Sequence, residues 1–167
     1  LCLREINLSL SLVIWLMALN ASYPRVVDRG NGAEGDLPMR VLLIEDEPTT
    51  AKAIEMMLTT EGFNVYQTDL GEEGLDLGKL YDYDIILLDL EMPGMHGLDA
   101  LPLLRHIAPD ARIIIFSAHC ALGGEWTDHI LALGADDVVA KPAHGGFDTP
   151  FMTRFLARLK NSGAGRG

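Results

Sequence analysis

Five side chains that could do chemistry stand directly at or after the ends of short apolar runs. They are three carboxylates, a hydroxyl and an ammonium: Glu45, Asp46, Asp89, Ser117 and Lys141. Carboxylates brought together need a cation, because one pair 4 Å apart costs about 4 kcal/mol at a surface-like effective dielectric. Hard oxygen ligands suit Mg²⁺, which leaves room for phosphate oxygens. A carboxylate can then attack phosphorus and form an aspartyl phosphate.

Each of these residues taken alone is more often structural. An acid at a strand end is usually a solvated loop residue or a helix cap, a lone serine a turn former, and a lone lysine a surface charge. Phosphoryl transfer, however, needs charge neutralisation and alignment more than covalent help. Mg²⁺ together with Lys141 would supply both. The joint pattern therefore favours a phosphoacceptor site.

The elements expected between residues 39 and 160 bring the five positions together. Strands are predicted by the apolar runs at 40–44, 63–66, 84–89, 113–116 and 137–140. Helical spacing of apolar residues follows each run. Five β–α units without a hairpin signal predict an α/β fold, a parallel sheet with helices on both faces. The carboxyl ends of such strands meet at one crevice, where ligands bind.

The third predicted helix, residues 98–107, contains a proline. If Asp99 is the N-cap of this helix, Pro102 falls in the first turn, where no backbone hydrogen bond is lost.

Composition limits the class of protein. The chain has 167 residues, of which 49% are hydrophobic, enough for one domain with a core. Its formal charge of −11, from 24 acidic and 13 basic residues, argues against direct binding of nucleic acid. The two cysteines form neither a disulfide framework nor a metal site. Cytoplasmic localisation is therefore expected.

The chain divides into three segments. Residues 1–38 carry an apolar run, Leu8 to Leu19, which is too short for a membrane span of roughly 20 residues. This segment is predicted to be a disordered leader or a misassigned start; a tether, a short helix and an export signal are the alternatives. Residues 39–160 form the predicted domain, and residues 161–167 form a Gly-rich flexible tail.

Residues 39–160 resemble response-regulator receiver domains of two-component systems. The motifs that carry the resemblance are Ile44-Glu45-Asp46-Glu47, the run from Asp89 to Gly97, Ser117-Ala118 and Lys141-Pro142. Residues 39–91 are most similar to the receivers of CtrA-type cell-cycle regulators. The resemblance implies a flavodoxin-like, doubly wound five-stranded parallel sheet with strand order 2-1-3-4-5.

The resemblance also implies a role for each carboxylate. Asp89 would be the phosphoacceptor, receiving its phosphoryl group from a histidine kinase or a histidine phosphotransferase. Asp46 and Asp89 would bind Mg²⁺ directly, and Glu45 would bind it through water. The backbone carbonyl of Glu91 would be a further metal ligand.

Ser117 and Lys141 would contact the phosphoryl oxygens in this family. The chain departs from the family pattern in several places, among them the stretch Cys120 to Thr127 and two single positions near the lysine. Val138 stands where an aromatic switch residue is usual, three residues before the lysine, and Ala143 stands where a phenylalanine is common. These departures put the usual switch mechanism in doubt.

The predicted function is that of a single-domain receiver, a signalling domain and not an enzyme. Its output would be an unidentified protein bound at the face of the fourth helix, fifth strand and last helix; a homodimer through that face is an option. Two alternatives are a truncated DNA-binding transcription factor and a docking receiver that is never phosphorylated. A phosphatase or nucleotide-binding enzyme is disfavoured, because the sequence has no Gly-x-Gly-x-x-Gly or P-loop run.

Overall fold

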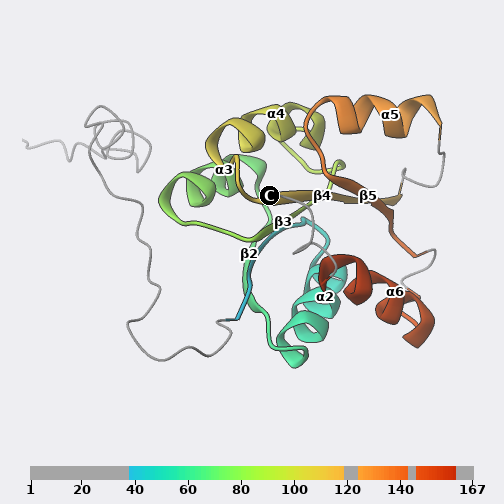
Figure 1. The fold of residues 1–167 in the computed structure, drawn as a ribbon. Helices are drawn as coiled ribbons and strands as arrows, with labels where there is room; N and C mark the ends of the chain where they lie inside the picture. The colour runs from blue at the N-terminus through green and yellow to red at the C-terminus, as the bar shows by residue number, and fades with distance from the viewer. Residues whose placement is uncertain (1–37, 119–123, 143–145, 161–167) are drawn as a thin grey trace, which may run out of the picture.

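The computed structural model describes residues 38–118, 124–142 and 146–160. In chain order the elements are β1 (Arg40–Ile44), α2 (Pro48–Thr60), β2 (Asn64–Thr68), α3 (Gly71–Leu80), β3 (Ile85–Leu88), α4 (Gly97–Ile107), β4 (Arg112–Ser117), α5 (Glu125–Ala132), β5 (Asp137–Ala140) and α6 (Thr149–Lys160). The strands form one parallel sheet in the order β2-β1-β3-β4-β5. Helices α3, α4 and α5 cover one face, and α2 and α6 cover the other (Figure 1). The predicted fold and strand order are confirmed.

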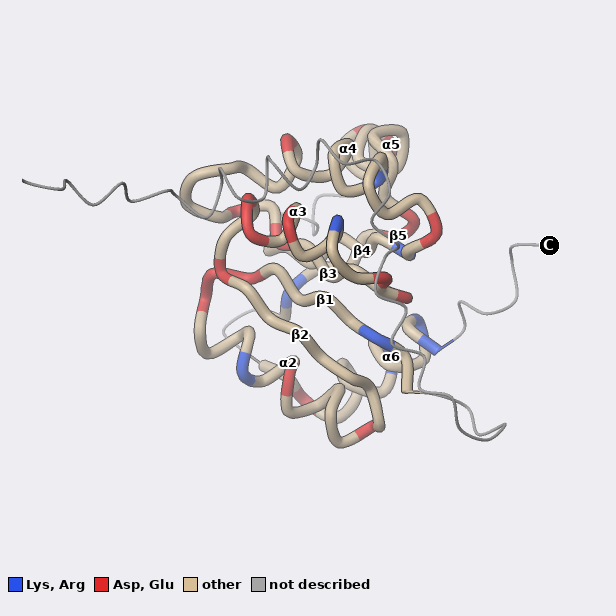
Figure 2. The backbone as a smooth tube through the Cα atoms, turned by 90° about the vertical axis from the view of Figure 1, so that its left-hand side faces the viewer, with Lys and Arg blue, Asp and Glu red and all other residues tan. Residues whose placement is uncertain are grey.

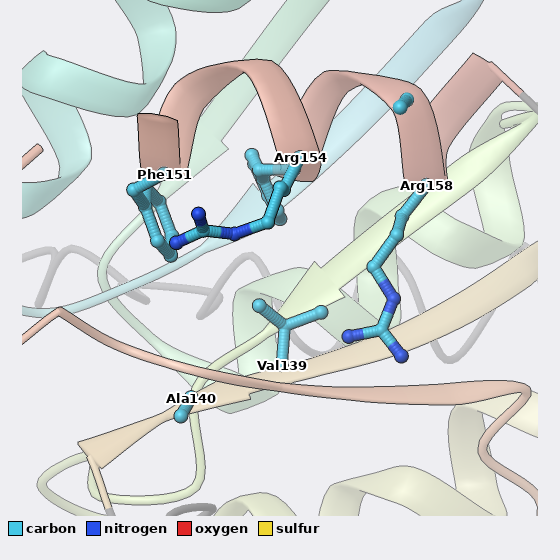
Figure 3. A pocket seen from close by; sticks show the side chains of 7 residues that line it. Val139, Ala140, Phe151, Arg154 and Arg158 are labelled. Atoms are coloured by element: carbon cyan, nitrogen blue, oxygen red, sulfur yellow. The ribbon is translucent and has the colours of Figure 1, made fainter. Parts of the chain in front are cut away.

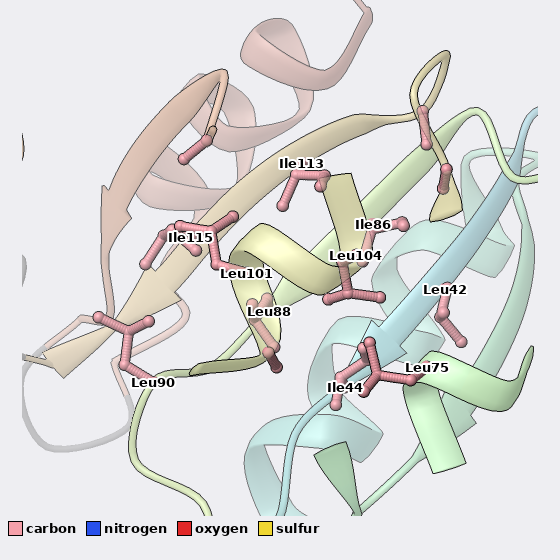
Figure 4. Packing of buried hydrophobic residues seen from close by; sticks show 14 of the residues in the cluster. Leu42, Ile44, Leu75, Ile86, Leu88, Leu90, Leu101, Leu104, Ile113 and Ile115 are labelled. Atoms are coloured by element: carbon pink, nitrogen blue, oxygen red, sulfur yellow. The ribbon is translucent and has the colours of Figure 1, made fainter. Parts of the chain in front are cut away.

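The central strands are buried on both faces, which explains their unbroken apolar sequences. Leu42, Ile44, Ile86 and Leu88 point toward α3 and α4, where they form one hydrophobic cluster (Figure 4). Their neighbours along β1 and β3 alternate to the other side, where they pack under α2 and α6. Burying one aliphatic side chain of this size is worth about 1.5–3 kcal/mol. Both faces of these strands therefore contribute to the core.

Helix α3 packs closely against its neighbours through glycines on its buried side. A Cβ atom added at Gly74 would lie 2.4 Å from Cδ1 of Ile44 in β1. One added at Gly78 would lie 3.2 Å from Cδ1 of Ile107 in α4. Gly71 similarly contacts the loop that follows β3. Side chains at these positions would hold α3 farther from the sheet.

Helix α4 begins earlier than expected. Its N-cap is His96, whose Nδ1 accepts a hydrogen bond from the Leu98 N–H at 3.2 Å. The expectation that Asp99 is the N-cap is therefore wrong. Pro102 lies beyond the first turn, so the helix lacks the N–H that would bond to the Leu98 carbonyl. Strand β2 also differs, since it begins one residue later and extends two residues farther than predicted.

Arg105, near the end of α4, connects this helix to later parts of the chain through hydrogen bonds and an ion pair. Its Nε donates to the Gly134 carbonyl at 2.9 Å, and its Nη1 donates to the Ala111 carbonyl at 2.8 Å. Its Nη2 pairs with the Asp136 carboxylate. That carboxylate also accepts from the Ile113 N–H at 2.8 Å. One side chain thus joins α4, the start of β4 and the turn before β5.

Arg40 begins β1 among three tyrosine rings. Its guanidinium carbon lies 5.4, 5.8 and 5.6 Å from the ring centroids of Tyr66, Tyr81 and Tyr83. Its backbone N–H donates to Asp84 Oδ2 at 2.7 Å. The Tyr83 hydroxyl is buried and has no hydrogen-bond partner in the described part of the chain. Burial raises the pKa of Tyr83 to about 12.

The predictions about a membrane span, the leader and the tail concern regions that the structure covers only in part. Within residues 38–118, 124–142 and 146–160, no helix is long and apolar enough to cross a membrane. The run from Leu8 to Leu19 lies outside the described residues, as do nearly all of the predicted leader and the predicted tail. The assignments of those two segments stay predictions.

Candidate functional site

The carboxyl ends of four neighbouring strands place the predicted residues together. Asp89 follows β3, and its N–H donates to the Ile44 carbonyl at the end of β1 at 2.9 Å. Lys141 follows β5, and its N–H donates to the Ser117 carbonyl at the end of β4 at 3.0 Å. Ser117 itself is fully buried. These backbone bonds continue the ladder past the strands and hold the site residues in register.

Lys141 bridges two buried carboxylates. Its Nζ lies 2.7 Å from Glu45 Oε1 and 2.8 Å from Asp89 Oδ2. Glu45 is 1% exposed and Asp89 is 3% exposed, so both contacts are largely shielded from solvent. Burial by itself lowers the pKa of Lys141, but the contacts with Asp89 and Glu45 outweigh it and raise the pKa. The ammonium therefore stays charged at neutral pH.

Glu45 is only partly satisfied by this contact. Burial, the largest influence, raises the pKa of Glu45 to about 7 despite the opposing effect of Lys141. Its second oxygen, Oε2, is buried and has no hydrogen-bond partner among the described residues. A buried carboxylate oxygen without a partner costs free energy. The geometry thus leaves an acceptor for a cation or for a water bound to one.

Three carboxylates are arranged so that they could hold a metal ion. Glu45, Asp46 and Asp89 each offer one oxygen, and these oxygens all lie within 4.8 Å of one another. An all-oxygen donor set suits a hard divalent cation such as Mg²⁺. The residues present therefore fit the predicted ion. Glu91 is exposed in the loop after Asp89, and the role of its backbone carbonyl stays a prediction.

The fourth acid of this region, Glu47, serves a different purpose. Its carboxylate caps α2 by accepting from the Thr49 and Thr50 N–H groups at 2.9 and 2.6 Å. Hydrogen bonds from Thr50, then from Thr49, lower the pKa of Glu47 to about 2. The carboxylate of Glu47 is therefore occupied at the helix start.

The backbone of Asp89 is fixed from two sides. Asp89 Oδ1 accepts from the Leu90 N–H at 2.7 Å, which orients the carboxylate. A Cβ atom at Gly97 would lie 2.3 Å from the Asp89 carbonyl oxygen and 2.6 Å from Leu90 Cα. The first residue of α4 therefore packs directly on the backbone of Asp89 and Leu90. Sequence reasoning assigned Gly97 no role, although the residue ends the motif that starts at Asp89.

An aromatic residue beside Lys141 was also missed. Phe116 precedes Ser117 in β4, and its ring centroid lies 5.8 Å from Lys141 Nζ. Phe116 reads in the sequence as an ordinary core residue of a strand. Only the pairing of β4 with β5, in which Phe116 is opposite Val139, shows that it is a neighbour of the lysine.

Comparison with known proteins agrees with this geometry. Residues 41–146 match the family model of the response regulator receiver domain. The chain belongs to this family. Receiver domains are signalling domains of two-component systems, and the predicted resemblance is confirmed.

The relatives of this receiver domain include cell-cycle regulators. It is 55% identical over 106 residues to the cell cycle transcriptional regulator CtrA of Caulobacter vibrioides, and 54% identical over 106 residues to the cell cycle response regulator CtrA of Brucella ovis. Each match covers 64% of this chain and 45% of the relative. The chain thus spans less than half the length of these relatives.

Solved structures show the same fold. The response regulator domain of Thermotoga maritima CheB superposes with a TM-score of 0.65 at 26% identity, covering 74% of this chain and 95% of that one. The receiver domain of a Pseudomonas aeruginosa sensor histidine kinase has a TM-score of 0.61 at 30% identity, covering 75% and 99%. That structure has a magnesium ion coordinated in its active-site cleft.

Proposed function

We propose that this receiver domain accepts a phosphoryl group on Asp89 from a histidine kinase or a histidine phosphotransferase. The observation that carries the proposal is the position of Asp89, which is shared between the Lys141 ammonium and the carboxylate cluster with Glu45 and Asp46. A carboxylate oxygen of Asp89 attacks phosphorus, an O–P bond forms, and the P–N bond of the donor breaks. The donor imidazole leaves with the electron pair of that bond.

The residues around Asp89 would each take part in this step. Glu45, Asp46 and Asp89, with the Glu91 backbone carbonyl, would hold Mg²⁺, which when bound neutralises charge on the phosphoryl oxygens. Lys141 would transfer one of its contacts from the Asp89 carboxylate to a phosphoryl oxygen. The Ser117 hydroxyl would donate to another phosphoryl oxygen. No other substrate is expected to be turned over.

The phosphoryl group would change which proteins the domain binds. It adds a charge near −2, and the shift of Lys141 and Ser117 leads into β4 and β5. The output partner would bind at the face of α5, β5 and α6, through which a homodimer could also form. This signalling would take place in the cytoplasm, without direct contact between these residues and nucleic acid.

A second candidate is the receiver part of a longer cell-cycle transcription regulator. The observation that favours it is the 55% identity to CtrA of Caulobacter vibrioides, of which this chain covers 45%. The coding sequence immediately after the codon for Gly167 tests this candidate. A DNA-binding domain in the same reading frame would support it, and a stop codon would contradict it.

The phosphoacceptor proposal is tested by the intact mass of the protein after incubation with Mg²⁺ and acetyl phosphate. The wild-type chain should gain one phosphoryl group, and Asp89→Asn should gain none. Glu91→Gln is the matched control, because it removes a nearby carboxylate but keeps the backbone carbonyl. It should be labelled like the wild type. A folded wild-type protein without an adduct would instead indicate a docking receiver.

A further inference from the structure

Four phenylalanine rings form a continuous group between β4 and α6. This phenylalanine cluster consists of Phe116 in β4, Phe147 before α6, and Phe151 and Phe155 in α6. The centroid of Phe116 lies 6.4, 6.2 and 5.4 Å from those of Phe147, Phe151 and Phe155. Phe116 and Phe155 are each 1% exposed. Rings in such contact cannot move independently, because protein interiors are close-packed.

The cluster touches the acceptor site through Lys141. The ammonium that binds Glu45 and Asp89 also lies 5.8 Å from the Phe116 ring centroid. A cation over an aromatic face is attracted by the ring, more strongly where water is excluded. Two carboxylates and one ring therefore set the position of the ammonium.

The cluster lies on the opposite face of the sheet from Val138. Val138 packs with the hydrophobic cluster under α3, α4 and α5, whereas Phe116 belongs to the cluster under α2 and α6. Val138 has no ring that could move in response to Ser117. The aromatic contact with the site is therefore made on the α6 side.

The far end of the cluster borders a groove between β5 and α6. The groove has a volume of about 490 Å³, and Phe151 and Phe155 are among the residues that line it. Figure 3 shows Phe151 and Arg154 of α6 facing Val139 of β5 across the groove. A change in the packing of these rings would alter the wall of the groove directly.

We propose that Phe116 positions the Lys141 ammonium and couples its movement to α6, so that the groove between β5 and α6 changes when Asp89 is modified. The inference rests on the proposed phosphorylation of Asp89. A phosphoryl oxygen draws the ammonium away from its position over Phe116. The ring then repacks against Phe151 and Phe155, which moves α6 relative to β5.

The test uses beryllofluoride with Mg²⁺ as a mimic of the phosphoryl group, read by amide chemical shifts of the full chain. In the wild type, the amides of Asp89 and Leu90 should shift together with those of α6. In Phe116→Leu, the Asp89 and Leu90 shifts should remain, because Glu45 and Asp89 still bind the Lys141 ammonium, and most of the shift in α6 should be lost. Phe63→Leu is the matched control. Phe63 is buried in the core under α2 and α6, as Phe116 is, but it is not part of the phenylalanine cluster, and the ring beside Lys141 is that of Phe116. Phe63→Leu should keep both responses.

A second pair of variants, at Phe151, tests the inference independently in case Phe116→Leu does not fold. Phe151 is half-buried, so Phe151→Leu should fold, keep the Asp89 response and lose much of the α6 response. Phe151→Tyr, which retains a ring, should keep both. An α6 response that survives in Phe116→Leu and Phe151→Leu would overturn the inference alone. A wild type whose Asp89 and Leu90 amides do not respond at all would overturn the proposed function as well.

Discussion

At the scale of single residues, Lys141 joins the two buried carboxylates of the candidate site. Glu45 and Asp89 are both buried, and the Lys141 ammonium lies between them and contacts both carboxylates. Removing one partner of a buried charge pair typically costs about 3–5 kcal/mol. Even with Lys141 in place, the pKa of Glu45 stays near 7 and its Oε2 stays without a partner. The site is therefore favourable for a divalent cation.

Tyr83 gives a prediction about stability at the opposite end of the sheet. Tyr83→Phe removes a buried hydroxyl without a partner and keeps the ring beside Arg40, so the free energy of unfolding at pH 7 should rise by roughly 1 kcal/mol. The pKa of Tyr83 is raised from 10.0 to about 12 in the fold. The fold thus favours the neutral form, so the wild type keeps its full stability below pH 10 and loses stability as the pH rises from 10 toward 12, where Tyr83 ionises more readily in the unfolded chain.

Urea unfolding at pH 7 and at several values above pH 10 measures both effects. The variant should lose less stability than the wild type across the alkaline range. Tyr66→Phe is the control, since the Tyr66 hydroxyl is exposed and accepts from Asn64 Nδ2 at 3.3 Å. A destabilised Tyr83→Phe would show that the hydroxyl has a favourable partner.

At the scale of elements, the glycines of α3 allow it to pack close to β1 and α4 but lower its intrinsic helix stability. Glycine in a helix interior is less favourable than alanine by about 1 kcal/mol. Helix α3 carries Gly74 and Gly78 within its ten residues, in addition to Gly71 at its start. The close contacts with Ile44 and Ile107 require this arrangement to different degrees.

The two glycines should therefore respond differently to alanine. Gly74→Ala places Cβ 2.4 Å from the buried Ile44 and should destabilise the fold by about 1–3 kcal/mol. Gly78→Ala meets only the end of the half-buried Ile107 side chain at 3.2 Å, so the gain in helix propensity should offset the contact to within about 1 kcal/mol. Thermal unfolding of both variants measures the difference. Equal losses would mean that the approach of α3 to β1 is not the constraint.

The elements were largely predictable because their signals are local. Buried apolar runs mark β1 and β3, and Pro48 with Gly62 marks the ends of α2. The start of α4 was not predictable in this way. Aspartate is a common N-cap residue, which favoured Asp99 in the sequence, but the side chain of His96 caps the helix.

Some residues of the candidate site could likewise be predicted from the sequence, and one could not. Glu45, Asp46 and Asp89 could be placed together because each lies at the end of a predicted parallel strand or directly after it. Phe116 could not be linked to Lys141, because their contact depends on the register of β4 with β5 and on the side chain lying on the α6 face. The predicted strands bring their carboxyl ends together, but the spacing of residues along the chain does not predict a contact that depends on strand register and side-chain orientation.

At the scale of the whole molecule, charge is unevenly distributed. The chain has a formal charge of −11, yet α6 carries three basic residues and no acidic one (Figure 2). Acidic residues instead occupy the carboxyl ends of β1 and β3 and the first turn of α3. This distribution attracts cations toward the carboxyl ends of these strands.

Binding of Mg²⁺ should therefore stabilise the entire fold. A ligand at one hundred times its dissociation constant adds about 2.7 kcal/mol to the free energy of unfolding if it binds only the folded state. The melting temperature should rise with MgCl₂, compared at matched ionic strength with NaCl, and Asp46→Asn should remove most of the rise. Asp110→Asn is the control, because this exposed acid precedes β4 and so lies at the amino ends of the strands, away from the carboxylate cluster. Equal rises in all three proteins would indicate a general salt effect.

The contacts of Arg105 bear on the order in which the chain folds. Its partners Gly134 and Asp136 lie 29 and 31 residues farther along the chain. Both contacts require β4 and α5 to be packed against the sheet beside α4, and closing the intervening loop costs entropy. Contacts that form after the rate-limiting step slow unfolding and leave the folding rate nearly unchanged. We therefore expect the half of the sheet that carries Lys141 to be slow to open once the contacts of Arg105 have formed.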